Sequence, residues 1–308
     1  MSREKRSWEK FRGANGPRPA NFPDTCCALT VQAIPRMGRF RQRASLTEDR
    51  RLDGSLFNGK FCQNRALRIL SSFLPLVGFA LVAPHPLHLL ARSMADVFHR
   101  TVDIAGPAGR LEAMLWTVAD ENPRLASVVC HPHPLFGGTM HNKVVYQVAK
   151  ALHNEGVPVL RFNFRGAGLS EGSHDEGRGE QEDVRAALDY LAGQFPGKPI
   201  LLAGFSFGAW VGLRVGCEDE RARALIGLGL PANDSELTYL RFCAKPKLII
   251  QGGNDQYGSR ANVESLVATI PEPKRLVIVD GADHFFTGKL DQVAIAVANW
   301  LRTQLAPL

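Results

Sequence analysis

The sequence predicts an α/β fold, with a mostly parallel sheet and helices on both of its faces. Two observations carry this prediction. From residue 125 onward, short apolar runs alternate with longer segments of helical periodicity, which is the order of repeated β-α units. The apolar runs are also nearly continuous, as expected of parallel strands that are buried on both faces. A chain of 308 residues is long enough for one such domain of about 200–250 residues and an extension.

Each element follows from its own pattern. Two alternating runs, 98–106 and 110–118, are joined by a turn rich in Gly and Pro and predict an antiparallel hairpin. Six further strands are predicted at 125–130, 157–164, 199–203, 224–230, 247–251 and 275–280. Helices are predicted at 143–156, 180–195, 206–215, 260–270 and 290–305. In such sheets, active groups gather in the loops that leave the C-terminal ends of the strands.

The segment GFSFG, residues 204–208, lies at one of these strand ends. A Gly-x-Ser-x-Gly sequence between a strand and a helix is typical of a nucleophile elbow, in which a strained turn projects the serine hydroxyl. Gly204 and Gly208 are expected where the strand and the helix cross too closely for side chains. In a chain with 29 glycines the motif also fits an ordinary glycine-rich turn, so Ser206 needs partners before it can be called a nucleophile.

Two partners follow at later strand ends. Asp255 comes just after the strand at 247–251, and His284 just after the strand at 275–280. Taken singly, Asp255 fits a turn that uses Asp for local hydrogen bonding, and His284 fits a half-buried histidine. The order Ser206, Asp255, His284 at three strand ends favours a Ser-His-Asp triad over three coincidences.

Other assignments for the polar residues are weaker. Asp280 and Asp283 are too close to His284 in sequence to approach it from a separate loop, although Asp280 could orient it. The pair His131 and His133 suggests a metal site, but prolines separate these residues and no third ligand is evident, so no metal is expected. The glycines of 166–172 have GxGxxxG spacing and acidic residues follow them, so no nucleotide cofactor is expected.

The N-terminal part differs in composition from the rest of the chain. Residues 1–94 carry 16 Lys and Arg but 6 Asp and Glu, out of 37 and 30 in the whole chain. The net positive charge therefore belongs to 1–94, and no nucleic-acid surface is expected on the folded domain, 95–308. Residues 1–94 are predicted to be a disordered or non-native extension. Transit peptides share this arginine bias. The same composition is explained if the assigned start site lies upstream of the true one and the protein begins at Met94, and we favour this explanation.

An apolar run at 69–91 contains 23 residues without a formal charge, which is long enough to span a bilayer. Three prolines and two histidines within it argue against a membrane anchor. The six cysteines are Cys26, Cys27, Cys62, Cys130, Cys217 and Cys243. None of the last three has C-x-x-C spacing, so free thiols in a reducing compartment are expected, and with them a cytoplasmic protein. The sequence does not indicate an oligomeric state.

Four strings, HPHPLFGGTMHNKVV, RFNFRGAGLSEG, GFSFGAW and GADHFFTGKL, resemble the α/β-hydrolase superfamily, and within it a branch of small bacterial predicted hydrolases. The resemblance covers roughly residues 96–306. It implies the α/β-hydrolase fold, with Ser206 as nucleophile, His284 as base and Asp255 as the acid that orients the base. It does not imply a substrate.

Acyl transfer by such a triad needs two backbone donors for the oxyanion. Phe207, at the start of the helix after Ser206, is expected to supply one N–H. The other must come from the loop HPHPLFGG, where Pro132 and Pro134 have no N–H. His133 and Leu135 remain, and His133 is preferred because it holds the position usual in the superfamily.

Only 231–245 remain between two predicted strands where many relatives insert a lid, so a minimal fold without a cap domain is expected. An open site should then be lined by some of the aromatic residues Phe136, Phe205, Phe207, Trp210, Tyr257 and Phe285. The predicted function is that of a serine carboxylesterase on small or short-acyl esters. A hydrolase of amides, peptides, thioesters or lactones shares every residue named above, and a non-catalytic scaffold used for binding is the alternative from another class.

Overall fold

The computed structural model describes residues 99–304 with the exception of 121 and 234. The predicted extension at 1–94, its apolar run at 69–91 and the three cysteines before residue 63 lie outside the described residues. None of the described helices combines the length and the apolar composition needed to cross a membrane.

Eight strands form one sheet in the order β1-β2-β4-β3-β5-β6-β7-β8. The six strands from β4 to β8 in this order run parallel, whereas β2 is antiparallel to β4 and to β1. The strands are β1 (His99–Gly106), β2 (Gly109–Trp116), β3 (Ala126–Cys130), β4 (Val159–Phe162), β5 (Ile200–Phe205), β6 (Ala222–Leu228), β7 (Lys247–Gly252) and β8 (Lys274–Val279). The mostly parallel sheet predicted from the sequence is therefore confirmed.

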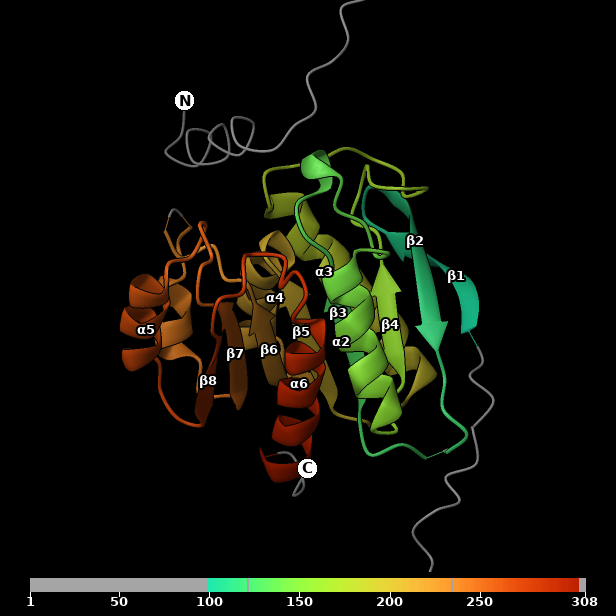
Figure 1. Cartoon of the computed structure of the whole chain (residues 1–308). Helices are drawn as coiled ribbons and strands as arrows, with labels where there is room; N and C mark the ends of the chain where they lie inside the picture. Colours follow the sequence, from blue (N-terminus) through green and yellow to red (C-terminus); the bar gives the residue numbers. More distant parts are fainter. Residues whose placement is uncertain (1–98, 121, 234, 305–308) are drawn as a thin grey trace, which may run out of the picture. The chain divides into compact units, whose positions relative to one another are not determined.

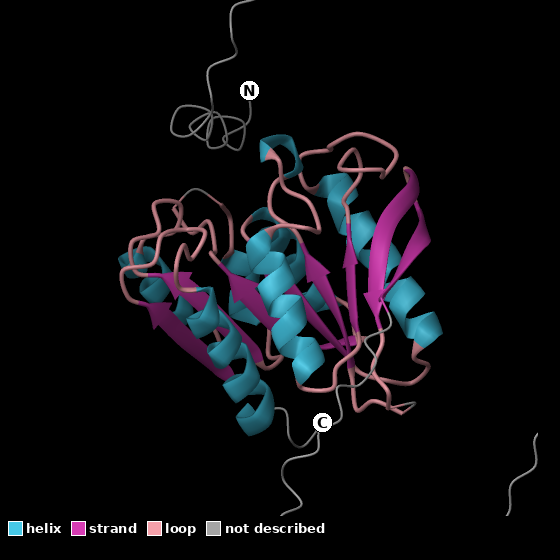
Figure 2. Ribbon diagram, turned by 45° about the vertical axis from the view of Figure 1, so that its right-hand side comes forward, coloured by secondary structure: helices cyan, strands magenta, loops and turns pink. Residues whose placement is uncertain are grey.

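Helices cover both faces of the sheet (Figures 1 and 2). Within the described residues the α-helices are α2 (Lys143–Asn154), α3 (Arg178–Gln194), α4 (Phe207–Glu218), α5 (Arg260–Ala268) and α6 (Leu290–Gln304). One apolar cluster joins α2 and α6 to one face, and a second joins α3, α4 and α5 to the other. Successive residues of a strand enter opposite clusters, such as Leu201 and Leu202 of β5, because side chains alternate across a sheet. This two-sided burial explains the continuous apolar runs in the sequence.

Most element boundaries differ from the prediction by one to three residues, and two of these differences have clear local reasons. Strand β6 covers Ala222–Leu228 rather than 224–230, and it ends at Gly229, whose φ of 53° turns the chain. Helix α3 begins at Arg178, two residues early, because the Glu180 carboxylate accepts the N–H of Gly177 and closes the first turn.

The chain order places a switch point beside β3. From β3 the chain passes to β4 on one side and then returns to β5 on the other, so the loops after β3 and β5 flank the position where open α/β sheets bind ligands. Between β6 and β7 the described residues contain one short 3-10 helix, Thr238–Phe242. The predicted absence of a cap domain is confirmed, and the switch point is left uncovered by any inserted lid.

Candidate active site

Ser206 lies between β5 and α4 in a backbone conformation that is unusual for a residue with a side chain. Its φ is 55° and its ψ is −116°, a region that costs about 1–3 kcal/mol when glycine is absent. The Ser206 N–H donates to the carbonyl of Leu228 in β6 at 2.9 Å, which holds the turn against the neighbouring strand. The strained elbow expected from GFSFG is therefore present.

The two glycines of the motif are required by different neighbours. A Cβ added to Gly204 would lie 2.3 Å from the carbonyl oxygen of Gly208, where the strand meets its own helix. A Cβ added to Gly208 would lie 2.4 Å from the carbonyl oxygen of His131, at the end of β3. The sequence predicted the first contact but not the second, because only the fold reveals that α4 crosses the adjacent strand so closely.

The three predicted triad residues meet at the C-terminal edge of the sheet. The Nε2 atom of His284 lies 2.9 Å from Ser206 Oγ, and its Nδ1 lies 2.8 Å from Asp255 Oδ2. A carboxylate can only accept, so Nδ1 carries the proton and Nε2 is left to accept the serine O–H. Their exposed fractions are 1%, 1% and 4% for Ser206, His284 and Asp255, so all three are shielded from bulk water.

Asp255 accepts several hydrogen bonds besides the one from His284. Its Oδ1 accepts the N–H groups of Tyr257 at 2.8 Å and Gly258 at 3.1 Å, and its Oδ2 accepts Gln251 Nε2 at 2.8 Å. Donors on both oxygens fix the orientation of this carboxylate. Gln251 was missed by sequence reasoning. The one signal in the sequence was an amide at the end of the apolar run KLII. In the structure this side chain is 0% exposed.

A small cavity of about 40 Å³ opens beside Ser206. Its walls include Ser206, His284, His133, Asn142 and the rings of Phe136 and Phe285, together with Pro132, Gly137 and Gly138. Two of the predicted aromatic residues, Phe136 and Phe285, are thus at the cavity.

The other predicted pocket residues do not line this cavity. Phe205 is 1% exposed and packs against the rings of His284 and Phe285. Trp210 is 8% exposed, and its indole N–H donates to the carbonyl of Glu236. The Tyr257 ring makes an edge contact with His284, with centroids 4.7 Å apart. Of these three, Phe205 and Trp210 are buried beside the elbow and in α4, whereas Tyr257 lies beside the triad histidine in the loop after β7.

The oxyanion donors proposed from the sequence lie on two sides of Ser206. Phe207 is the first residue of α4, and the first four N–H groups of a helix have no intrahelical acceptor. In the loop after β3, the N–H of Leu135 donates to His133 Nδ1 at 3.3 Å, and Leu135 is 63% exposed. The neighbouring ring thus engages this N–H, and the preference for His133 stays a prediction.

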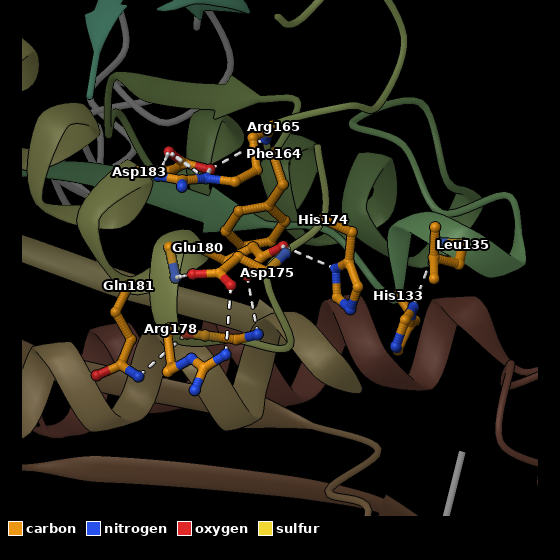
Figure 3. A network of polar contacts seen from close by, with 12 residues as sticks. His133, Leu135, Phe164, Arg165, His174, Asp175, Arg178, Glu180, Gln181 and Asp183 are labelled. Carbon is orange, nitrogen blue, oxygen red and sulfur yellow. Dashed lines mark hydrogen bonds and ion pairs between the residues drawn. The ribbon is translucent and has the colours of Figure 1, made fainter. Parts of the chain in front are cut away.

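Behind His133 lies a group of polar and aromatic side chains from the loop after β4 (Figure 3). The His174 ring contacts those of His133 and Phe207, with centroids 4.7 Å and 5.5 Å apart. His174 Nδ1 lies 2.7 Å from Glu180 Oε1. Burial acts to raise the pKa of Glu180, but the contact with His174 and the N–H of Asp175 outweigh it and lower that pKa. A buried carboxylate therefore holds a histidine against both residues that carry the proposed oxyanion donors.

The two histidines of the HPH string are neutral. Burial lowers the pKa of His131 to about 4 and that of His133 to about 3. His131 accepts the N–H of Phe164 at Nε2, 2.9 Å away, and its Nδ1 lies 2.6 Å from the Pro132 carbonyl. It thus ties the end of β3 to the end of β4. Among the described residues, no group of three or more His, Cys, Asp or Glu side chains is arranged to hold a metal ion.

The glycine-rich loop at 166–172 folds against the hairpin. Glu112 of β2 accepts Leu169 N–H at 2.8 Å and Asn163 Nδ2 at 2.7 Å. Ser170 Oγ accepts the N–H of Glu112 at 2.9 Å. The loop is therefore organised around a carboxylate, which is the wrong charge to receive a pyrophosphate.

Known proteins share both the sequence pattern and the fold. An alpha/beta hydrolase domain model matches residues 128–300. An uncharacterised protein of Rickettsia prowazekii is 37% identical over 207 residues, which are 64% of this chain and 87% of that protein.

Two solved structures are also similar over most of their own length. An α/β serine hydrolase homologue from Coxiella burnetii is 38% identical and has a TM-score of 0.63, covering 66% of this chain and 97% of that one. A lidless member of the α/β serine hydrolases from Xanthomonas campestris is 34% identical with a TM-score of 0.62, covering 68% and 96% of the two chains. With the strand order, the strained serine turn and the uncovered switch point described above, these matches lead to one assignment: the chain belongs to the α/β-hydrolase family.

Proposed function

We propose that this hydrolase is a serine carboxylesterase that acts on small or short-acyl esters through Ser206, His284 and Asp255. The observation that supports it most is the continuous pair of contacts, 2.9 Å from Ser206 Oγ to His284 Nε2 and 2.8 Å from His284 Nδ1 to Asp255 Oδ2. These distances are within the range over which a base takes a proton from a nucleophile.

In the first half-reaction Ser206 Oγ attacks the ester carbonyl carbon and its proton passes to His284 Nε2. Asp255 stabilises the imidazolium through Nδ1. The carbonyl oxygen becomes an oxyanion, which accepts the N–H groups of Phe207 and His133. As the tetrahedral intermediate collapses, the alcohol leaves with the proton from His284 Nε2, and the acyl group stays on Ser206.

The second half-reaction repeats these steps with water as the nucleophile. His284 Nε2 accepts a proton from water as the water oxygen attacks the acyl-enzyme carbonyl, and the same two N–H groups receive the oxyanion. Return of the proton to Ser206 Oγ releases the carboxylic acid.

Support for short acyl groups comes from the size of the cavity. The cavity of about 40 Å³ beside Ser206, lined by Phe136 and Phe285, has room for few carbon atoms, and the described residues include no inserted lid to cover a long chain. In an apolar pocket each methylene is worth about 1–3 kcal/mol of transition-state binding when it fits, and a clash removes a similar amount. We therefore expect kcat/KM for p-nitrophenyl acetate and butyrate to exceed that for the octanoate at least about tenfold. Equal or better hydrolysis of the longer ester would contradict the size argument.

The test of the nucleophile is labelling of the full chain by a fluorophosphonate, which reacts with activated serines. Labelling should be lost in Ser206→Ala and kept in the matched control Ser235→Ala, a serine in the β6–β7 connection. A folded parent protein that takes no label would favour the binding scaffold instead. Comparison of p-nitrophenyl acetate with p-nitroacetanilide and a short thioester then separates esterase from amidase and thioesterase activity. The partner proposed is a small acyl substrate, and the cytoplasmic location stays a prediction.

A further inference from the structure

Two thiols meet at the far end of α4, away from Ser206. Cys217 lies in the last turn of α4, and Cys243 directly follows the 3-10 helix Thr238–Phe242. Their side chains are hydrogen-bonded to each other, and both are free thiols. Helix α4 begins at Phe207, so Cys217 is about 15 Å along its axis, at 1.5 Å per residue. The pair is therefore separate from the proposed catalytic site.

Two lysines accompany this thiol pair without an acidic partner. Lys245 Nζ donates to the carbonyls of Gly216 and Asp219, at 2.7 Å and 2.6 Å, and so caps the end of α4. Lys247, in β7, is 1% exposed, and its Nζ donates to the carbonyl of Pro271 at 3.0 Å. Within the described part of the chain, neither lysine forms an ion pair with a carboxylate. Burial lowers the pKa of both lysines, and Cys243 comes before Asp219 and Glu272 among the charged groups that oppose this, because a buried ammonium group favours a nearby anion.

The donors around the two sulfur atoms distinguish them. The hydrogen bond from Cys217, the backbone N–H of Lys245 and the charge of Lys247 lower the pKa of Cys243 to about 6, although burial opposes them. The same thiol contact and burial raise the pKa of Cys217. Cys130 lies alone within β3, and burial raises its pKa well above the ordinary value. Of the three described cysteines, Cys243 is thus the one prepared to react as a thiolate.

A surface hollow gives small molecules access to this pair. It has a volume of about 730 Å³ and is lined by Cys217, Glu220, Arg223, Ala244, Lys245 and Pro246. Cys217 is partly exposed and lines it, whereas Cys243 does not line it but directly precedes Ala244, which does. Hydrogen peroxide is scarcely larger than water, which makes it the hydroperoxide best suited to reach a sulfur atom that is 3% exposed.

We propose that Cys217 and Cys243 are a redox-active dithiol, an oxidation site that hydroperoxides convert to a disulfide. The Cys243 thiolate attacks one oxygen of the hydroperoxide, the O–O bond breaks, and the other oxygen leaves as an alkoxide or hydroxide that takes up a proton. Cys243 is then a sulfenic acid. The Cys217 sulfur attacks the Cys243 sulfur, the S–O bond breaks, and the hydroxide leaves as water with the Cys217 proton. Two thiols are oxidised by two electrons, and the hydroperoxide is reduced to an alcohol, or water, and water.

The test uses the full chain, treated with hydrogen peroxide at pH 7, alkylated after denaturation and digested with trypsin. Cys217 and Cys243 fall in the peptides 215–221 and 242–247. The expected product is these two peptides joined by a disulfide, two hydrogen masses lighter than their sum, and separated again by dithiothreitol. Cys130, in the same digest, should stay a thiol and serves as the internal control. The proposal is overturned if Cys217 and Cys243 both stay reduced in peroxide, or if they are oxidised no faster than Cys130.

Variants separate the roles of the two sulfur atoms. Cys217→Ser should let dimedone trap a sulfenic acid on Cys243, whereas Cys243→Ser should leave Cys217 reduced at the same peroxide dose. Lys247→Met keeps the buried stem but removes the charge, and it should slow oxidation of Cys243 roughly tenfold through a smaller thiolate fraction. Lys150→Met, on the exposed side of α2, should not change the rate. If Lys247→Met oxidises as fast as the parent protein, the charged cluster does not activate Cys243. Circular dichroism of each variant excludes unfolding as the cause.

Discussion

The two sides of Ser206 are held in place by different kinds of contact. On one side, His284 and Asp255 are connected to Ser206 by hydrogen bonds of 2.8–2.9 Å, and Gln251 supports Asp255 by another of 2.8 Å. On the other side, the ring of His133 packs against the rings of His174 and Phe207, with centroids 4.7–5.5 Å apart. A directed hydrogen bond is lost when one atom changes, whereas a packing contact depends on shape. We therefore expect substitutions that keep the shape of a side chain but change its polarity to lower activity strongly on the first side and only slightly on the second.

The largest expected effect is on the hydrogen-bonded side. Asp255→Asn keeps the shape of the side chain but removes the anion that holds the His284 Nδ1–H tautomer. An equivalent change in other serine hydrolases lowers kcat about 10⁴-fold, and we expect a loss of that order in kcat/KM for p-nitrophenyl acetate. Asp280→Asn is the matched control, because its carboxylate is 85% exposed and bonds to Arg260. If both variants lost kcat/KM to a similar extent, Asp255 would not be the acid that orients His284.

A second prediction concerns the elbow that joins the two sides. Gly208→Ala would place a Cβ 2.4 Å from the His131 carbonyl oxygen, so α4 must move away from β3 and take Phe207 with it. Overpacking of this kind costs about 1–3 kcal/mol of stability, and misplacement of a donor costs roughly a hundredfold in kcat. Gly193→Ala is the control, since a Cβ at this α3 position meets nothing within 4 Å. Gly193→Ala should raise the melting temperature slightly and leave kcat unchanged. A normal kcat in Gly208→Ala would show that the crossing of α4 and β3 is not tight.

The third prediction concerns pH and the oxyanion side. Burial lowers the pKa of His131 to about 4, whereas the unfolded chain binds the proton near its ordinary value of about 6.5. Between these values only the unfolded state is protonated, so the stability is complete above pH 6.5 and falls as the pH drops to 4. The shift corresponds to about 3 kcal/mol, or roughly a few hundredfold in the unfolding equilibrium constant.

Urea unfolding at pH 7 and pH 4.5 measures this loss. His131→Asn should be less stable than the parent at pH 7 but should lose less stability on acidification, because its amide does not titrate. His141→Asn, at an exposed residue of the same connection, should keep the parent's pH dependence. Equal losses in His131→Asn and the parent would mean that His131 does not contribute.

The same contrast explains what the sequence could predict. The triad order, the elbow glycines and the absent lid could be read from local patterns, since each depends on a short segment at a strand end. The positions of Phe205 and Trp210 could not, because the direction in which a side chain next to the elbow points depends on the crossing of α4 with β3 and β5. Gln251 was a single polar residue in an apolar run, and the ring contacts of His174 join two loops and the start of α4, which are distant in sequence. Both contacts depend on tertiary packing that no single segment encodes.

The smallest expected effect tests whether packing alone holds the oxyanion side. His174→Ala removes the ring that contacts both His133 and Phe207, and we expect kcat to fall roughly tenfold with KM unchanged, since the donors act on the transition state more than on the bound ester. His174→Phe restores a ring but not the contact with Glu180, so if shape is what matters its kcat should return to within about threefold of the parent. His141→Ala is the matched control for loss of a histidine from this region. A His174→Phe enzyme as slow as His174→Ala would show instead that the buried Glu180 carboxylate acts through the polar atoms of His174, and the two sides of Ser206 would then be built alike.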